Sequence, residues 1–295
     1  MSPYSQITQN KSKTFLIMVI FIVLFTGFFY LVGKYFDSPS YYLILGLVIS
    51  SASSIGSYFY SDKIVLLTTG ARAASKKEFF DFYTTTENLA LAAGLPMPAL
   101  YVIDDPSPNA FATGRDPKHA VVCATTGLLK NLDRSDVEGV ISHELSHIKN
   151  YDILISSVVA VLVGTLAIIS DWIMRSFWWR GRDDDNRNKS PIFALLFIIV
   201  LIITPIVATL IQLAISRKRE FLADASGVLI TRNPAGLASA LEKIAVYPSM
   251  KKSSPSTAHL FISNPLKKKN QSSWLLNLFS THPPIEERIK ILRSM

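Results

Sequence analysis

Long apolar segments alternate with polar regions along this chain. Four such segments run over residues 14–33, 41–60, 153–174 and 192–215. Each is close to the ~20 residues that a helix needs to cross a hydrocarbon core about 30 Å thick. We therefore expect residues 1–60 to form an N-terminal transmembrane hairpin. Residues 153–215 should form a second hairpin that crosses the membrane or is embedded in it.

The polar regions, residues 61–152 and 216–295, have the pattern of a small folded domain. Apolar runs bounded by turn residues predict short strands at Leu100–Ile103 and Ala120–Thr125, with a loop at Asn109–Asp116 between them. Apolar residues at helical spacing predict helices at Lys77–Ala93, Asp133–Asn150, Arg217–Ile230, Pro234–Val246 and Pro284–Ser294. Ser135 and Glu138 fit a capping box, and Met250–Ser273 is predicted as a mobile loop. The fold class is mainly α with a small β-sheet.

Composition supports a membrane protein. Hydrophobic residues make up 49% of the 295 residues, and the mean hydropathy is +0.30. The net charge of +8 fits basic loops that face anionic lipid. No stripe of Lys and Arg interleaved with aromatic residues is present, so we expect no nucleic-acid partner. The single cysteine, Cys123, excludes an intramolecular disulfide.

Basic residues also predict the orientation in the bilayer. They precede the first apolar segment and follow the second, at Lys11, Lys13, Lys63, Arg72, Lys76 and Lys77. The positive-inside rule then places the N-terminus and the region after residue 60 in the cytoplasm. The loop 175–189 is also basic, which the rule does not expect outside. Whether 153–215 crosses fully therefore stays open.

A metal-binding motif lies in the predicted helix 133–150. His143 and His147 are four residues apart, so both imidazoles face the same side of the helix and can bind one Zn²⁺. Glu144 lies beside them, where it can act as general base on a water that zinc acidifies to a pKa of about 7. An intramembrane protease of the site-2 class carries this motif inside an apolar span, and the polar residues here argue against that class.

A third ligand is expected after the fourth apolar segment. Catalytic zinc takes three protein ligands and keeps one open position. Glu220 and Asp224 are four residues apart on a predicted helix, so Glu220 can bind the metal and Asp224 can accept a hydrogen bond from a ligating histidine. On spacing alone, ordinary surface carboxylates beside the basic residues 217–219 remain an equal alternative.

The sequence HELSHIKN at 143–150, together with REFLAD at 219–224, resembles the HtpX-type membrane zinc metalloproteases, gluzincins related to the CAAX prenyl endopeptidase. The resemblance covers nearly the whole chain, because the apolar segments occur in the same order. It implies a zincin-like α+β protease domain on a multi-span helical membrane protein. The first part, 61–152, would carry the histidine helix, and the second part, 216–295, would carry Glu220 as the third zinc ligand.

Two further segments share this resemblance. NAFATG at Asn109–Gly114 resembles a family segment beside an edge strand that holds substrate, which implies that Asn109 binds a peptide amide or carbonyl. The alternative is an Asn that forms a turn after Pro108. THPP at Thr281–Pro284 resembles the family's C-terminal segment, so His282 would donate to the oxyanion during catalysis. The alternative is a cap before the last helix.

The predicted function is that of a membrane-bound zinc endopeptidase with one Zn²⁺ per chain. The resemblance implies protein or peptide substrates, quality control of misfolded or membrane proteins under stress, and a bacterial plasma membrane with the protease domain facing the cytoplasm. The sequence predicts no oligomeric state. A non-enzymatic membrane protein with a structural zinc remains an alternative, as does acyl chemistry on other substrates such as prenylated peptides.

Overall fold

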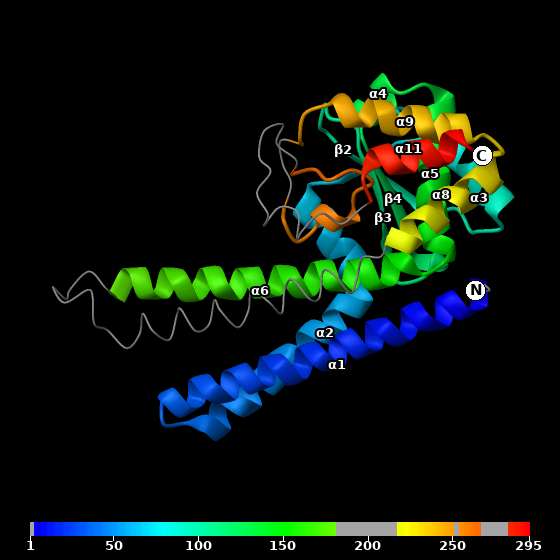
Figure 1. The fold of residues 1–295 in the computed structure, drawn as a ribbon. Coiled ribbons are helices and arrows are strands. Elements are labelled where there is room, and N and C mark those ends of the chain that lie inside the picture. Colours follow the sequence, from blue (N-terminus) through cyan, green and yellow to red (C-terminus); the bar gives the residue numbers. More distant parts are fainter. Residues whose placement is uncertain (1–2, 181–216, 251–253, 267–282) are drawn as a thin grey trace.

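Long helices form one part of the molecule, and a small sheet covered by helices forms the other (Figure 1). This computed structural model describes residues 3–180, 217–250, 254–266 and 283–295. The long helices are α1 (Pro3–Tyr35), α2 (Pro39–Thr69) and α6 (Asp152–Arg180). They confirm the first three predicted apolar segments as helices. The fourth segment, 192–215, lies outside the described residues.

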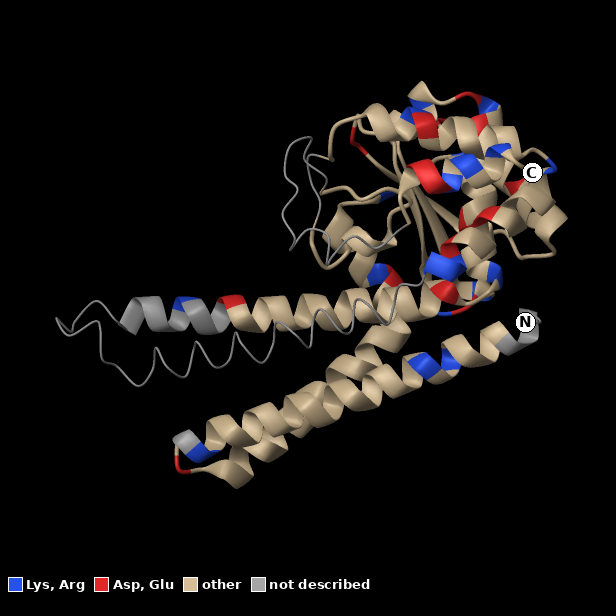
Figure 2. Cartoon of the chain, in the orientation of Figure 1, with Lys and Arg blue, Asp and Glu red and all other residues tan. Residues whose placement is uncertain are grey.

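Within the described ranges, α1, α2 and α6 are long and apolar enough to cross a membrane. Figure 2 shows no charged residue along the middle of α1 and α2. α1 and α2 form an antiparallel hairpin, and α6 packs against both (Figure 1). One buried apolar cluster joins α1 to α6, through Ile17, Phe21, Phe25, Phe28, Leu154, Ile155, Val158, Val159 and Leu162. The membrane helix α1 is thus fixed against the first turns of α6.

The sheet contains β1 (Arg72–Ala73), β2 (Ala99–Ile103), β3 (Ala110–Gly114) and β4 (Ala120–Thr125) in the order β1-β2-β4-β3. β2 and β4 are parallel, and the other pairs are antiparallel. β3 is therefore an edge strand.

The predicted loop at Asn109–Asp116 is wrong, because it contains β3. Ala110 and Ala112 face the main core, whereas Phe111 faces a second cluster on the other side of the sheet. Small residues on one face, Ala110 and Ala112, gave the segment a weak apolar pattern, and Pro108 suggested a turn at Asn109. It is a strand because its backbone pairs with β4, and both of its faces are buried.

Helices cover the sheet and form the rest of this part. They are α3 (Phe80–Ala93), α4 (Thr126–Asn131), α5 (Arg134–Lys149), α8 (Arg217–Thr231), α9 (Pro234–Val246) and α11 (Ile285–Arg293), with short 3-10 turns η1 (Pro117–His119) and η2 (Ala258–Leu260). All five predicted helices are confirmed, and α4 was not predicted. The mainly α fold with a small sheet is confirmed as well.

Two local predictions need correction. The capping box of α5 uses Asp133 and Asp136, not Ser135 and Glu138, because the helix begins directly after Asp133. The Asp133 N–H donates to the Asp136 carboxylate at 3.2 Å.

The stretch 250–273 was predicted to be a mobile loop, but its described part is packed. Phe261 stacks edge-on against Phe111 with ring centroids 4.9 Å apart, and the Ile262 N–H donates to the Ala110 carbonyl at 2.9 Å. Apolar residues at 260–262 hold this part in the core.

Candidate metal centre

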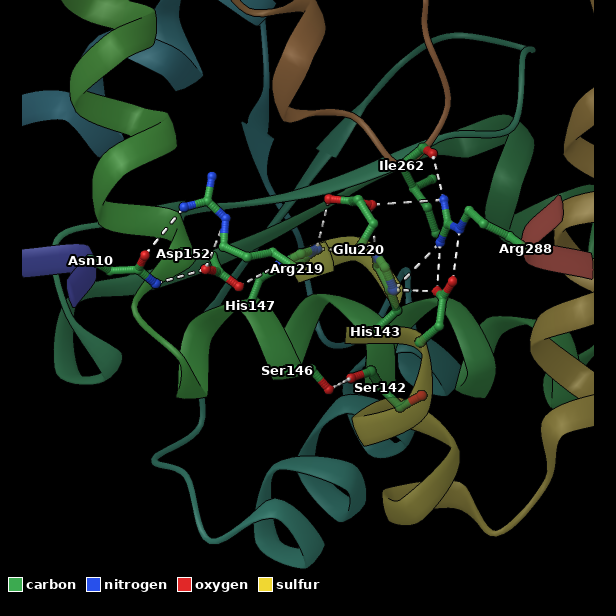
Figure 3. A network of polar contacts seen from close by, with 11 residues as sticks. Asn10, Ser142, His143, Ser146, His147, Asp152, Arg219, Glu220, Ile262 and Arg288 are labelled. Atoms are coloured by element: carbon green, nitrogen blue, oxygen red, sulfur yellow. Dashed lines mark hydrogen bonds and ion pairs between the residues drawn. The ribbon is translucent and has the colours of Figure 1, made fainter. Parts of the chain in front are cut away.

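Three side chains from two helices converge beside the sheet. His143 and His147 lie on α5, and their Nε2 atoms are 3.1 Å apart. Glu220 on α8 brings its Oε2 to 3.7 Å from His143 Nε2 and its Oε1 to 3.6 Å from His147 Nε2 (Figure 3). The ligand atoms of all three lie within 4.8 Å of one another. The structure thus brings together the residues predicted to hold the metal.

Small residues allow α8 to approach α5 this closely. Ala223 is fully buried, and Gly227 lies against the backbone of α5. A Cβ atom at Gly227 would lie 3.1 Å from the His143 backbone nitrogen and 3.0 Å from Ser142 Oγ. These distances are tighter than ordinary van der Waals contact, so a larger side chain at 227 would push Glu220 away from the histidines.

A carboxylate fixes each imidazole from its far side. His143 Nδ1 is 2.8 Å from Asp224 Oδ1, and His147 Nδ1 is 3.0 Å from Asp152 Oδ2. This hydrogen-bond network assigns the proton of each neutral ring to Nδ1, and both Nε2 lone pairs then point at one another. Two nitrogens 3.1 Å apart, with their lone pairs toward each other, need a cation that both contact, either a shared proton or a metal ion. The arrangement therefore fits a bound metal ion.

Glu144 is a residue of α5, and its side chain faces the edge strand β3. Its side chain is buried, and the backbone N–H of Ala112 donates to it. Burial raises the pKa of Glu144 to about 7, since the charged carboxylate loses hydration. A carboxylate with such a pKa can accept and return a proton near neutral pH. Of the three converging side chains, His147 is the most exposed at 15%, so the centre opens on its side.

A buried arginine, which was not predicted from the sequence, lies against the centre. Arg288 on α11 is fully buried. Its Nε and Nη2 donate to Asp224 at 2.9 and 2.7 Å, and its Nη1 lies 3.8 Å from Glu220 Oε2. Its positive charge and the His143 hydrogen bond outweigh burial and lower the pKa of Asp224 to about 2. One signal in the sequence pointed to a buried role for Arg288. It lies on the same face of the predicted helix as the apolar residues Ile285, Ile289 and Leu292.

The comparison with known proteins decides the family. The model of peptidase family M48 matches residues 77–295, which include the converging side chains and Arg288. The chain belongs to this family. It is 48% identical to the "Protease HtpX homolog" of Tropheryma whipplei (strain Twist), over 99% of this chain and 98% of that protein. It is 46% identical to the protein of the same name from Caldanaerobacter subterraneus subsp. tengcongensis, over 99% and 97%.

Among solved structures, the chain is similar to the crystal structure of S. mikatae Ste24p, with a TM-score of 0.48 and 18% sequence identity. The match covers 94% of this chain and 62% of that chain. The M48 assignment rests on the family model and the HtpX relatives, which make this protein a membrane-associated metallopeptidase. A non-enzymatic membrane protein with a structural zinc is therefore not supported.

In this M48 peptidase the Asn109 side chain is engaged within the chain. Its Nδ2 donates to the Ser263 carbonyl at 2.8 Å, and its Oδ1 accepts from the backbone nitrogens of Ala110 and Ser263 at 3.1 and 3.3 Å. A peptide that uses this amide must displace Ser263, so substrate binding by Asn109 stays a prediction. His282 lies outside the described residues, and its role at the oxyanion stays a prediction too.

Proposed function

We propose that this protein is a zinc endopeptidase of the bacterial plasma membrane that hydrolyses peptide bonds of misfolded or membrane proteins. The observation that carries the proposal is the convergence of His143, His147 and Glu220, with Glu144 beside them. Two histidines and one glutamate are a ligand set typical of catalytic zinc, which leaves one coordination position open. A bound Zn²⁺ supplies a Lewis acid and lowers the pKa of water to about 7.

In this proposal the chain's own residues bind the peptide and move protons. Glu144 takes a proton from water and returns it to the leaving amine. The peptide backbone pairs with the edge strand β3, where it takes the Ala112 N–H from the Glu144 carboxylate and the Ala110 carbonyl from the Ile262 N–H. Asn109 binds substrate after the Ser263 segment moves, and His282 donates to the oxyanion.

The position of the centre supports substrates that emerge from the bilayer. α6 begins at Asp152, five residues after His147, and Glu220 lies in the first turn of α8. At 1.5 Å per helical residue, the metal would lie close to the membrane surface. The basic residues around the first hairpin favour the cytoplasmic side. We propose the protease domain in two parts, 61–152 and 216–295, separated by a hairpin at 153–215 and preceded by one at 1–60.

A metal-removal experiment tests this function. The full-length protein in detergent should cleave casein and an unfolded membrane protein, lose all cleavage when a chelator removes the metal, and recover it when one equivalent of Zn²⁺ is added back. Mg²⁺ should not restore activity, because it prefers oxygen ligands in octahedral geometry. Unchanged cleavage by protein that metal analysis finds free of zinc contradicts the proposal.

Metal binding should release a proton. Burial lowers the pKa of His147, but the hydrogen bond to Asp152 and the nearby carboxylates outweigh it and raise the pKa to about 9 in the metal-free protein. Below that pH a proton competes with the metal, so the apparent Zn²⁺ affinity should rise about tenfold per pH unit from pH 7 to 9 and then level off. Calorimetry in buffers of different ionisation enthalpy should find about one proton released at pH 7. An affinity independent of pH over this range contradicts the prediction.

A further inference from the structure

A buried amide on the first membrane helix contacts residues that lie beside the metal centre. Asn10 lies on α1, before the apolar stretch, and is 3% exposed while its neighbours Gln9 and Lys11 are exposed. Its Nδ2 donates to the Asn150 carbonyl at 2.9 Å and to Asp152 Oδ1 at 2.8 Å. The amide thus reaches the junction between α5 and α6 (Figure 3).

Asn10 also links the start of α6 to α8, the two elements that lead to His147 and Glu220. Asp152 accepts from Asn10 with one carboxylate oxygen and faces His147 Nδ1 with the other, at 3.0 Å. Asn10 Oδ1 accepts from Arg219 Nη1 at 3.2 Å, and Arg219 directly precedes Glu220. Two hydrogen bonds therefore separate Asn10 from one proposed metal ligand, and a contact to Arg219 leads to another.

The chemistry of this position calls for an amide. The side chain must donate to Asp152 and to a carbonyl while it accepts from Arg219, and an amide offers both functions on one planar group. A carboxylate of the same shape has no hydrogen to donate. It would also place a second negative charge beside Asp152, where the two would repel.

Packing holds the amide in place. Ile17, Phe21 and Phe25 of α1 pack against the first turns of α6, where Asp152 is the first residue. The Lys11 ammonium lies 4.4 Å from the centroid of the Tyr151 ring, one residue before Asp152. The position of α1 is therefore transmitted to the carboxylate that orients His147.

We propose that Asn10 is a positioning residue of the metal centre: it fixes Asp152, which fixes the ring of His147, so the N-terminal membrane helix is part of the site. The proposal rests on the metal site of the proposed function. Partners that hydrogen-bond a ligating imidazole typically change metal affinity by about 10–100-fold. Since Asn10 acts one step further out, an effect near the lower end of that range is expected.

The test measures Co²⁺ and Zn²⁺ affinity of the full-length protein in detergent, by competition with a chromophoric chelator. Asn10→Ala should weaken binding about tenfold and alter the visible Co²⁺ spectrum, and Asn10→Asp should weaken it more. Gln9→Ala removes an exposed amide one residue away and should leave affinity unchanged. Ile244→Ala removes packing from the separate main core under α9, and should lower the unfolding temperature without the tenfold loss.

A double-mutant cycle with Asp152→Asn tests the route. If Asn10 acts through Asp152, Asn10→Ala should cost little further affinity once Asp152 is replaced. An undiminished loss in that background overturns the proposal, as does parental affinity in Asn10→Ala or an equal loss in Ile244→Ala. A parent protein that binds no Co²⁺ overturns the proposed function and this proposal together, whereas metal binding by the parent with an unaffected Asn10→Ala overturns this proposal alone.

Discussion

Replacing Glu144 by glutamine is expected to stop nearly all peptide cleavage while the metal stays bound. Glutamine keeps the shape of the side chain and the contact with Ala112 but cannot take a proton from water. Since Glu144 is not among the three converging ligands, zinc content should stay near one per chain. General acid–base groups contribute about 10²–10⁴-fold, so kcat should fall by that factor with KM little changed.

Glu138 provides a matched control on the same helix. It lies on the partly exposed side of α5, six residues before Glu144, and pairs with Arg134 at 3.1 Å. Glu138→Gln removes the same charge but is not one of the converging side chains, so it should cleave at the parental rate. Its exposed ion pair contributes at most about 1 kcal/mol to the stability of the protein. Metal analysis of both variants separates loss of the base from loss of zinc. Parental kcat in Glu144→Gln would contradict the assigned role.

Replacing Arg288 by leucine should destabilise the protein strongly. Arg288 is fully buried, donates two hydrogen bonds to Asp224 and lies 3.8 Å from Glu220. Without it, two buried carboxylates lose their positive partner, which typically costs on the order of 3–5 kcal/mol. Asp224 also orients His143, so Zn²⁺ affinity should fall as well. Denaturant titration in detergent measures the first effect, and chelator competition measures the second.

Arg293 on the same helix is the matched control. It pairs with Glu242 at 2.7 Å, but its side chain is 61% exposed, so Arg293→Leu should cost less than about 1 kcal/mol and leave metal affinity unchanged. Arg288→Lys keeps the charge but cannot form the paired hydrogen bonds of a guanidinium, and should fall between parent and leucine variant. Equal stability of the two leucine variants would refute the role given to the buried ion pair.

Local features of the chain were readable from the sequence because neighbours along the chain create them. The apolar stretches predicted α1, α2 and α6, and the apolar spacing predicted α5, α8, α9 and α11 to within a few residues. His143 and His147 face the same side of α5 because residues four apart on a helix do so in any fold. Strand β3 was missed, since its small residues show their burial only once α5 and the 254–266 segment cover it.

Only the tertiary structure decided which residues far apart in the chain come into contact. Glu220 could be proposed from spacing and resemblance, but its distance to the histidines depends on how α8 packs on α5. Arg288 and Asn10 carry no motif, and each reaches the centre across more than a hundred residues. The reason is physical: helical periodicity fixes which side chains share one face, whereas the position of one helix against another follows from packing of the whole core.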